Sequence, residues 1–355
     1  MRICLIASSR FPIREPFAGG LEAHTHALAG ELIRRGHQVS LFAAAGSDPD
    51  LGAAELEVAT FITSEAARLD VGSAPESWMQ EHHAYLRLML DLSREGTRRF
   101  DLVHNNSLHH LPVAMAESLE IPVVTTLHTP PIAWLESAAS LAPSSAHFVA
   151  VSEQVARAWS HVVSSATVYN GIDTDAWTPG SGGHGAVWCG RIVPEKAPHA
   201  AIDAARLAGM PLRLAGPAYD RVYFREEVAP RLGDEVQWVG HLPQDELHRL
   251  VGQADVALVT PAWEEPYGLV AAEAMSCGTP VAGFARGAMV ELVDEGTGRL
   301  ARPDDVRALS VAVGEAAALP RDVVRATAVA RWDLRRMVDE YEQLYRLLSH
   351  EGAAA

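Results

Sequence analysis

Short apolar runs rich in β-branched residues alternate along the chain with longer segments rich in Ala, Leu and Glu. A first series of such runs lies at residues 2–7, 38–43, 102–104, 122–127, 147–151 and 167–169. A second series lies at residues 186–189, 212–215, 236–239, 256–259, 280–283 and 298–301. Apolar strands that alternate with helical segments are typical of parallel sheets covered by helices. The pattern therefore predicts an α/β fold with one parallel sheet in each half of the chain.

Glycine and proline mark the junction between the two series. Residues 177–185 read Trp-Thr-Pro-Gly-Ser-Gly-Gly-His-Gly, a composition typical of a linker. The predicted division is a first domain at 1–178, a linker at 179–185, a second domain at 186–325 and a closing segment at 326–355. Apolar residues recur at helical spacing from Leu334 to Leu348, so the closing segment should contain an amphipathic helix.

Composition narrows the classes of partner. Lys and Arg total 29 against 45 Asp and Glu, and this formal net charge of −16 disfavours binding to nucleic acid or anionic lipid. The three cysteines, Cys4, Cys189 and Cys277, show no Cys-x-x-Cys spacing, which is typical of reduced cytosolic proteins. No apolar run reaches membrane-spanning length, and the run at 3–7 is too short for a signal peptide. We therefore predict a soluble, cytoplasmic protein that does not associate with membranes.

Two carboxylates eight positions apart flank a predicted helix start. Pro266 and Gly268 disfavour regular structure, whereas residues 269–275 are strong helix formers, so the helix should begin near Gly268. Glu265 then lies in a loop, and Glu273 lies about 7 Å along the helix axis. The two acids can reach different parts of one extended ligand. The exposed amides between them favour an anion or a row of hydroxyls.

The whole string from residue 264 to 281 resembles the donor-site signature of the family 4 retaining glycosyltransferases, in which two glutamates flank a Pro-Phe-Gly-Leu-like turn. The resemblance implies that Glu265 contacts sugar hydroxyls and that Glu273 hydrogen-bonds the ribose. It also implies that backbone amides near Gly268 and Leu269 help to hold sugar and phosphate. Tyr267 replaces the more usual Phe. For a lone pair of glutamates, a solvated helix residue and a cap-like acid would be the better interpretation, but here the full string matches.

Two cations follow the first strand of the second series. In open α/β sheets ligands bind at the carboxyl ends of strands, and Arg and Lys there suit a diphosphate. With the downstream motif, this segment resembles the family's pyrophosphate-binding loop, which implies that role for Gly190, Arg191 and Lys196. Ala197 replaces a Gly often found after the lysine and is followed by Pro198, so the loop backbone should differ.

Paired glycines open the first long helix of the first domain. Gly19 and Gly20 permit close backbone approach, but they follow a long loop and do not form a Gly-x-Gly-x-x-Gly fingerprint, which argues against a nicotinamide enzyme. The segment resembles the family's loop that approaches the donor phosphate and the acceptor. This resemblance assigns Gly19 and Gly20 to donor binding and Glu22 to acceptor binding.

A histidine ends a predicted central strand of the first domain. His128 precedes a Pro-Pro turn and matches the family's strand-end histidine, which implies an active-site role in contact with the transferred sugar. His104 and Asn105 end the preceding strand and are predicted to line an acceptor pocket. The loops at 8–20, 44–69, 108–112 and 129–145 are expected to supply the other acceptor contacts.

Histidine pairs and Asp-x-Asp strings do not predict a metal site. Histidines 24 and 26, 82 and 83, and 109 and 110 should form no convergent ligand set, because neighbours on a helix point in different directions. The Asp-x-Asp strings at 48–50 and 173–175 lie in turn-like sequence. Since Arg191, Lys196 and a helix start can neutralise a diphosphate, we predict no metal and no cofactor.

The leading hypothesis is a metal-independent, retaining glycosyltransferase. The resemblance implies two Rossmann-like domains facing a cleft, the GT-B architecture, with the acceptor on the first domain, the donor on the second, and the closing helix packed back on the first. A UDP-sugar is the donor most frequent in the family. A small soluble molecule or an oligosaccharide precursor is the predicted acceptor, and the oligomeric state is not predicted. A nucleotide-sugar epimerase, a phosphorylase and an inactive sugar-binding scaffold subunit are the alternatives.

Overall fold

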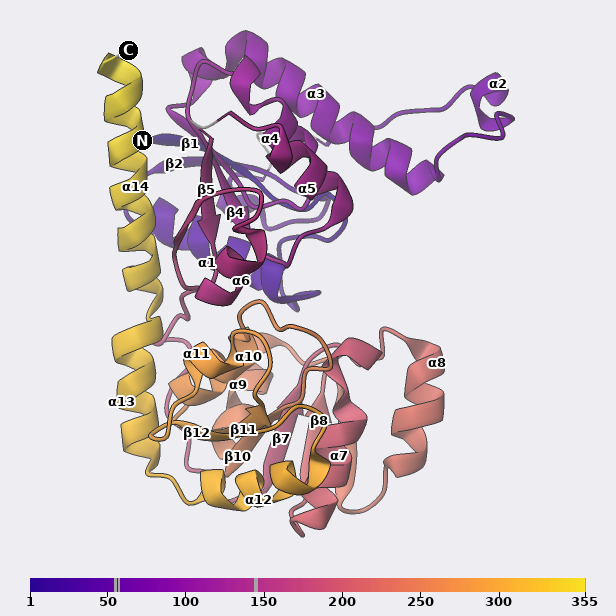
Figure 1. The fold of residues 1–355 in the computed structure, drawn as a ribbon, viewed down its shortest axis with the longest axis vertical. Coiled ribbons are helices and arrows are strands. Elements are labelled where there is room, and N and C mark those ends of the chain that lie inside the picture. The colour runs from indigo at the N-terminus through magenta and orange to yellow at the C-terminus, as the bar shows by residue number, and fades with distance from the viewer. Residues whose placement is uncertain (54–55, 57, 144–145, 355) are drawn as a thin grey trace. The chain divides into compact units, whose positions relative to one another are not determined.

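The computed structural model describes residues 1–53, 56, 58–143 and 146–354 (Figure 1). These residues divide into two compact units. The first unit comprises Met1–Val151, Val155–Val168 and the C-terminal residues from Val338, and the second comprises Ser152–Gln154 and Tyr169–Met337. The last residue of the predicted closing segment, Ala355, lies outside the described residues, as do residues 54, 55, 57, 144 and 145 of the predicted acceptor loops.

The first unit is built on a parallel sheet. Within the described residues its six strands run in the order β2-β1-β3-β4-β5-β6. Their bounds are β1 Arg2–Ile6, β2 Gln38–Phe42, β3 Leu102–Asn105, β4 Val123–Leu127, β5 His147–Ala150 and β6 Ser165–Thr167. The central strands are buried along most of their length, as expected where helices cover both faces. Strand order reverses between β1 and β3, and in open α/β sheets ligands bind at such a switch point.

Helices cover this first sheet, except the short helix at residues 65–68, which extends away from it (Figure 1). The helices of this unit are α1 Gly20–Arg34, α2 Glu65–Arg68, α3 Glu76–Arg99, α4 Leu111–Ala114, α5 Ala133–Ser140 and α6 Glu153–Trp159. Short 3₁₀ turns lie at Pro49–Leu51 and Ala116–Ser118. The inner face of α3 carries Tyr85, Leu88, Met89 and Leu92 into a core with residues of β1 and β3. This packing places the middle of α3 over the sheet, with the Tyr85 hydroxyl bonded to the Ala7 carbonyl just after β1.

The second unit repeats this plan. Its six strands within the described residues run β12-β11-β10-β7-β8-β9, all parallel, and strand order reverses between β7 and β10. The strands are β7 Ala186–Cys189, β8 Leu212–Ala215, β9 Val236–Gly240, β10 Val256–Val259, β11 Val281–Phe284 and β12 Gly298–Ala301. The prediction of two Rossmann-like units with parallel sheets is confirmed.

Helices and turns connect the strands from β7 to β12, and α12, α13 and α14 follow β12. They are η3 Pro194–Lys196, α7 Pro198–Leu207, α8 Arg221–Tyr223, η4 Phe224–Val228, η5 Ala229–Arg231, α9 Gln244–Gln253, α10 Leu269–Ser276, α11 Met289–Leu292, α12 Val306–Ala317, α13 Arg321–Trp332 and α14 Leu334–Ala354. Helices α7 and α12 pack on the sheet through small residues such as Ala201, Ala205 and Ala312. Among the described residues, every helix is too short or too polar to span a bilayer.

The long helix α14 starts in the second unit and continues in the first. From Val338 onward it belongs to the first unit, where Tyr341 and Tyr345 are completely buried. Residues 169–178, placed in the first domain by the sequence, lie in the second unit. There the Ile172 amide donates to the Trp332 carbonyl, and the Leu334 amide donates to the Ile172 carbonyl.

Candidate functional site

The turn between β10 and α10 presents the predicted glutamate pair in the second unit. Gly268 adopts φ 96°, a left-handed conformation that favours glycine, and α10 begins at the next residue. Glu265 lies in the loop before it and Glu273 lies within the helix, as the sequence predicted. The amides at the start of α10 therefore point out of the helix between the two carboxylates.

A close ion pair joins Lys196 and Glu265, two of the three residues of this unit for which a role in the reaction is predicted. Lys196 Nζ lies 2.6 Å from Glu265 Oε2, and Trp263 Nε1 donates to the same oxygen at 3.1 Å. The Lys196 ammonium also lies 5.3 Å from the centre of the Trp263 ring. Glu265 is only 8% exposed, so the pair is partly shielded from water. This arrangement holds one carboxylate and one ammonium group together beside the Trp263 ring.

The second glutamate is isolated from cations. Glu273 is half-buried, and no hydrogen bond or ion pair reaches its carboxylate among the described residues. Burial raises its pKa to about 7. The same carboxylate helps to raise the pKa of the neighbouring Cys189 and Cys277 thiols, although their own burial is the larger cause. A half-buried carboxylate without donors is suited to accept hydrogen bonds from a diol.

Arg191 supplies a cation at the carboxyl end of β7. Among the described residues no carboxylate pairs with it, and its guanidinium lies 5.7 Å from the centre of the Tyr219 ring. Gly190 before it adopts φ 153°, and Ala197 after η3 takes φ 43°. Ala197 thus occupies a left-handed conformation that favours glycine, which accounts for the glycine common at this place. Arg191 is available for a phosphate.

The position of Glu265 depends on a turn that sequence reasoning missed. Gly287, just after β11, adopts φ 61°, and a Cβ there would lie 2.3 Å from both the amide nitrogen and the carbonyl oxygen of Glu265. The Gly287 amide donates to Glu264 Oε2 at 2.9 Å, and the Ala288 amide donates to the Glu265 carbonyl at 2.8 Å. The signal for this turn in the sequence was the string Arg-Gly-Ala at residues 286–288, shortly after an apolar strand.

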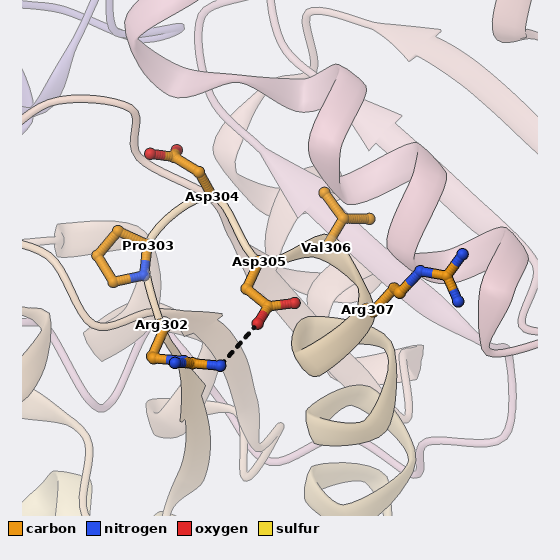
Figure 2. A pocket seen from close by; sticks show the side chains of 6 residues that line it. All are labelled: Arg302, Pro303, Asp304, Asp305, Val306 and Arg307. Atoms are coloured by element: carbon orange, nitrogen blue, oxygen red, sulfur yellow. Dashed lines mark hydrogen bonds and ion pairs between the residues drawn. The ribbon is translucent and has the colours of Figure 1, made fainter.

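The adjoining turn after β12 forms an open hollow lined by Arg302, Pro303, Asp304, Asp305, Val306 and Arg307 (Figure 2). Arg302 pairs with Asp305 there, as Figure 2 shows, at 3.4 Å. Asp304 pairs with Arg286 at 2.7 Å. No residue predicted for the site lines this hollow.

The side chain of one predicted donor residue, Tyr267, is buried in the core of the second unit. The Tyr267 side chain is 3% exposed, and its hydroxyl donates to the Asn170 carbonyl at 2.6 Å. It packs against the rings of Tyr169 and Trp332. The hydroxyl that distinguishes this chain from the usual Phe therefore serves the core, and only the backbone of Tyr267 remains a candidate for donor contact.

In the first unit, paired glycines begin α1 as predicted. Gly19 is the extended residue before the helix and Gly20 is its first residue. Glu22 lies in the first turn and is 5% exposed. The amides of this helix start can receive an anion or a hydroxyl.

His128 follows β4 and is oriented by an amide. Its Nε2 lies 2.9 Å from Asn106 Oδ1, which can only accept, so Nε2 carries the proton. Burial, together with His24 and His104 nearby, holds the pKa of His128 well below its usual range. The ring is therefore uncharged at neutral pH. It can contact hydroxyls but cannot serve as a cation.

The predicted acceptor residues His104 and Asn105 are buried inside the first unit. His104 lies 2.6 Å from the Tyr345 hydroxyl and 2.8 Å from Thr126 Oγ1, and burial lowers its pKa to about 3. Asn105 Oδ1 accepts from the amide and the hydroxyl of Ser107. Both side chains are fully buried, so their geometry supports the fold, and they are not part of the acceptor proposal below.

The prediction that the histidines would not converge is wrong for three of them. Ring nitrogens of His82, His109 and His110 all lie within 4.8 Å of one another. His82 lies on α3, whereas the other two precede α4, so the sheet topology brings together residues that sequence spacing keeps apart.

The chain matches two domain models. The model of Glycosyltransferase Family 4 matches residues 18–176, and the model of Glycosyl transferases group 1 matches residues 185–329. The glycogen synthase of Mycobacterium tuberculosis (strain CDC 1551 / Oshkosh) is 29% identical over 385 residues, which covers 96% of this chain and 91% of that protein. The D-inositol 3-phosphate glycosyltransferase of Mycolicibacterium smegmatis is 27% identical over 348 residues, which covers 83% of this chain and 78% of that protein.

A solved structure shares the whole fold. Anabaena HepE in complex with UDP-glucose has a TM-score of 0.74 and 20% identity, with 98% of this chain and 99% of that chain covered. The two matched domains follow each other along the chain just as the two parallel sheets do. The chain therefore belongs to the family 4 glycosyltransferases of GT-B architecture.

Proposed function

We propose that the protein is a retaining, metal-independent glycosyltransferase that moves a sugar from a UDP-sugar to a hydroxyl of its acceptor. The observation that carries the proposal is the group in the second unit: the Lys196–Glu265 pair at 2.6 Å, with Arg191 and Glu273 unpaired among the described residues. The uridine nucleotide is favoured because Anabaena HepE, which has the same fold, was crystallised with UDP-glucose.

Each group has a role in this proposal. Arg191 and Lys196 bind the diphosphate and stabilise the negative charge that grows as it leaves. Glu265 accepts hydrogen bonds from sugar hydroxyls, and Glu273 accepts from the ribose diol. The start of α10, with Gly268 and Leu269, offers amides to sugar and phosphate, as does Gly190 at the phosphate. In the first unit, His128 is proposed to contact the sugar, and Gly19, Gly20 and Glu22 to lie at the donor phosphate and acceptor.

The proposed reaction balances without a metal ion. The acceptor oxygen forms a bond to the anomeric carbon while the bond from that carbon to the diphosphate oxygen breaks. The diphosphate leaves with the bonding electron pair, and one of its oxygens takes the acceptor proton. Attack on the face that the nucleotide leaves retains the anomeric configuration. The protein contributes position and charge stabilisation.

Calorimetric titration of UDP, GDP, ADP and dTDP, with a chelator present, tests the donor proposal. We expect tight binding of UDP alone, then binding of one or more UDP-sugars. Glu273→Gln should weaken the binding, whereas Glu315→Gln, at an exposed position on α12, should leave it unchanged. Failure of every nucleotide to bind would refute the proposal and favour a scaffold subunit. Binding that needs a divalent cation would refute metal independence.

An acceptor-free product assay separates transfer from its enzymatic alternatives. A transferase releases UDP only slowly without an acceptor, whereas an epimerase converts the sugar of the donor and releases no nucleotide. A phosphorylase would require inorganic phosphate. NMR of the anomeric proton in the product then reports retention or inversion. Conversion of the donor sugar without transfer would replace the proposed function by epimerisation.

A further inference from the structure

A cluster of rings lies at the switch point of the first sheet, beside the carboxyl ends of β1 and β3. Tyr85 on α3 fixes its position, because the Tyr85 hydroxyl donates to the Ala7 carbonyl at 2.8 Å and accepts from the Ser9 amide at 3.3 Å. His109 and His110 arrive from the loop after β3. Open α/β sheets bind ligands at this place.

The rings form a continuous stack that leads from the core to the surface. The Tyr85 and His109 ring centres lie 4.3 Å apart with planes at 13°, and those of His109 and His110 lie 4.4 Å apart at 24°. His110 in turn lies 5.2 Å from Trp134 at 29°. Tyr85 is 1% exposed, whereas Trp134 is 64% exposed. The stack therefore offers solvent a broad aromatic face at Trp134, which α5 carries.

The ring nitrogens of this cluster lie within 4.8 Å of one another, but the face-to-face packing of the rings makes it a poor metal site. A ring nitrogen binds a metal through a lone pair in the ring plane, so the parallel rings of His109 and His110 direct their lone pairs side by side rather than to one point. The His109 Nδ1 lone pair already accepts from the Leu111 amide at 3.2 Å.

The cluster carries little net charge. Burial, with His110 and His82 adding to it, lowers the pKa of His109 to about 3, and burial also lowers the pKa of His110. The nearby cation Arg10 forms a bidentate pair with Glu81, at 2.7 Å for the closest atoms. The uncharged rings themselves offer no cation to an anionic ligand, so the cluster favours an uncharged one.

Hydrogen-bonding capacity remains on two of the rings. Among the described residues, His82 and His110 contact neighbouring rings, and no hydrogen bond uses their ring nitrogens. A neutral imidazole has one donor and one acceptor, and so it matches a hydroxyl in either direction. Trp78, 53% exposed, precedes His82 by one turn of α3 on the same face. Two exposed indoles thus flank the histidines along the chain.

We propose that Trp134, His110 and His82 form the acceptor platform of the proposed transferase, and that the acceptor is an uncharged, hydroxylated ring such as a sugar or a cyclitol. The C–H groups on one face of such a ring meet the negative face of the indole, and its hydroxyls exchange hydrogen bonds with the imidazoles. The role of the bound ring as an acceptor rests on the proposed function, whereas the binding of such a ring to the platform does not.

Saturation-transfer NMR on the full chain, with and without UDP, tests the platform. The probes are maltotriose and myo-inositol, which are uncharged, and inositol 1-phosphate, which is anionic. At least one uncharged probe should bind, and inositol 1-phosphate should bind more weakly than myo-inositol. Trp134→Ala should weaken the binding by about tenfold, and Trp134→Phe should retain most of it, since the stack survives. Leu141→Ala is the control, because Leu141 ends the same helix and is 84% exposed.

Several outcomes would overturn the inference. They are tighter binding of the phosphate than of myo-inositol, no binding of any probe, or unchanged binding by Trp134→Ala. The cluster would be a metal site instead if calorimetry showed that Zn²⁺ binds and displaces the sugar, and that His110→Ala abolishes this binding. If UDP fails to bind while the uncharged probes bind, the donor proposal falls and the platform stands. If UDP binds but no uncharged probe does, the platform falls alone.

Discussion

At the scale of single residues, the raised pKa of Glu273 predicts how donor binding depends on pH. Its pKa of about 7 lies above the value of 4.5 for a solvated glutamate, so near neutral pH a substantial fraction is protonated. A ribose diol donates hydrogen bonds and prefers the carboxylate. UDP affinity should therefore rise as pH increases from 6 to 8, which calorimetry at both pH values measures.

The matched variant for this pH effect is Glu273→Gln. An amide cannot ionise, so the pH dependence of UDP affinity should largely disappear with it. In the absence of ligand, a rise in pH should lower the stability of the folded protein, whereas it should raise the affinity for UDP. A carboxyl group with a raised pKa in the folded state loses stability as pH rises from 4.5 through about 7, so the variant should gain stability relative to wild type at pH 8. If UDP affinity changed with pH equally in wild type and in Glu273→Gln, Glu273 would not belong to the binding site.

Lys196 offers a second prediction at this scale. Lys196→Ala should lower kcat/KM by about a hundredfold or more, because the departing diphosphate loses a fixed positive charge. Lys196→Arg restores the charge but not the compact ammonium on Trp263, so it should recover only part of the activity. Circular dichroism controls for folding. Turnover like that of wild type in Lys196→Ala would exclude Lys196 from the mechanism.

The sequence assigned residues to this site but not the contacts that those residues make. Arg191, Lys196, Glu265 and Glu273 were assigned from local motifs, and all lie in the second unit. The ion pair of Lys196 with Glu265 spans 69 positions and depends on β7 lying beside β10, which no local pattern encodes. Resemblance also cannot show that the Tyr267 hydroxyl points into the core.

At the scale of elements, the turn after β11 controls the loop that carries Glu265. Gly287→Ala should cost roughly 1–2 kcal/mol of unfolding free energy for the left-handed backbone alone. The larger effect should be on UDP-sugar binding, because the new Cβ would meet the Glu265 backbone at 2.3 Å and displace the carboxylate. Urea unfolding and calorimetry on the same sample separate the two effects.

Gly314→Ala is the matched glycine control. Gly314 lies inside α12, and a Cβ there meets nothing within 4 Å. This substitution should stabilise the protein by roughly 0.5–1 kcal/mol without changing donor affinity. If Gly287→Ala also left donor affinity unchanged, the turn would not position Glu265.

Local pattern was sufficient to predict most elements but not their arrangement. The predicted strands of the second series match β7 to β12 closely, and the helix after Gly268 begins where the turn glycine permits. Strand order, by contrast, is set by contacts between distant segments. The ring stack shows the consequence, since Tyr85 and His109 belong to elements separated in the chain and meet only because α3 packs over β1 and β3.

At the scale of the whole molecule, two sheets with separate cores predict two separable responses. Tyr345 is fully buried in the first unit, and its hydroxyl lies 2.6 Å from His104. Tyr345→Ala should cost roughly 3–5 kcal/mol through lost packing, and Tyr345→Phe should cost less, about 1–3 kcal/mol for the hydrogen bond alone.

Hydrogen exchange read by mass spectrometry can assign each response to a unit. Tyr345→Ala should accelerate exchange in β1 to β5, while UDP at 100 times its Kd should protect β7 to β12 by up to about 2.7 kcal/mol. The ligand and the substitution act on different cores, so each should leave the other unit near its original exchange rates. Equal acceleration of both sheets by Tyr345→Ala would mean that the two units unfold as one cooperative block. In that case the continuous helix α14, which contributes residues to both units, would be the element that couples them.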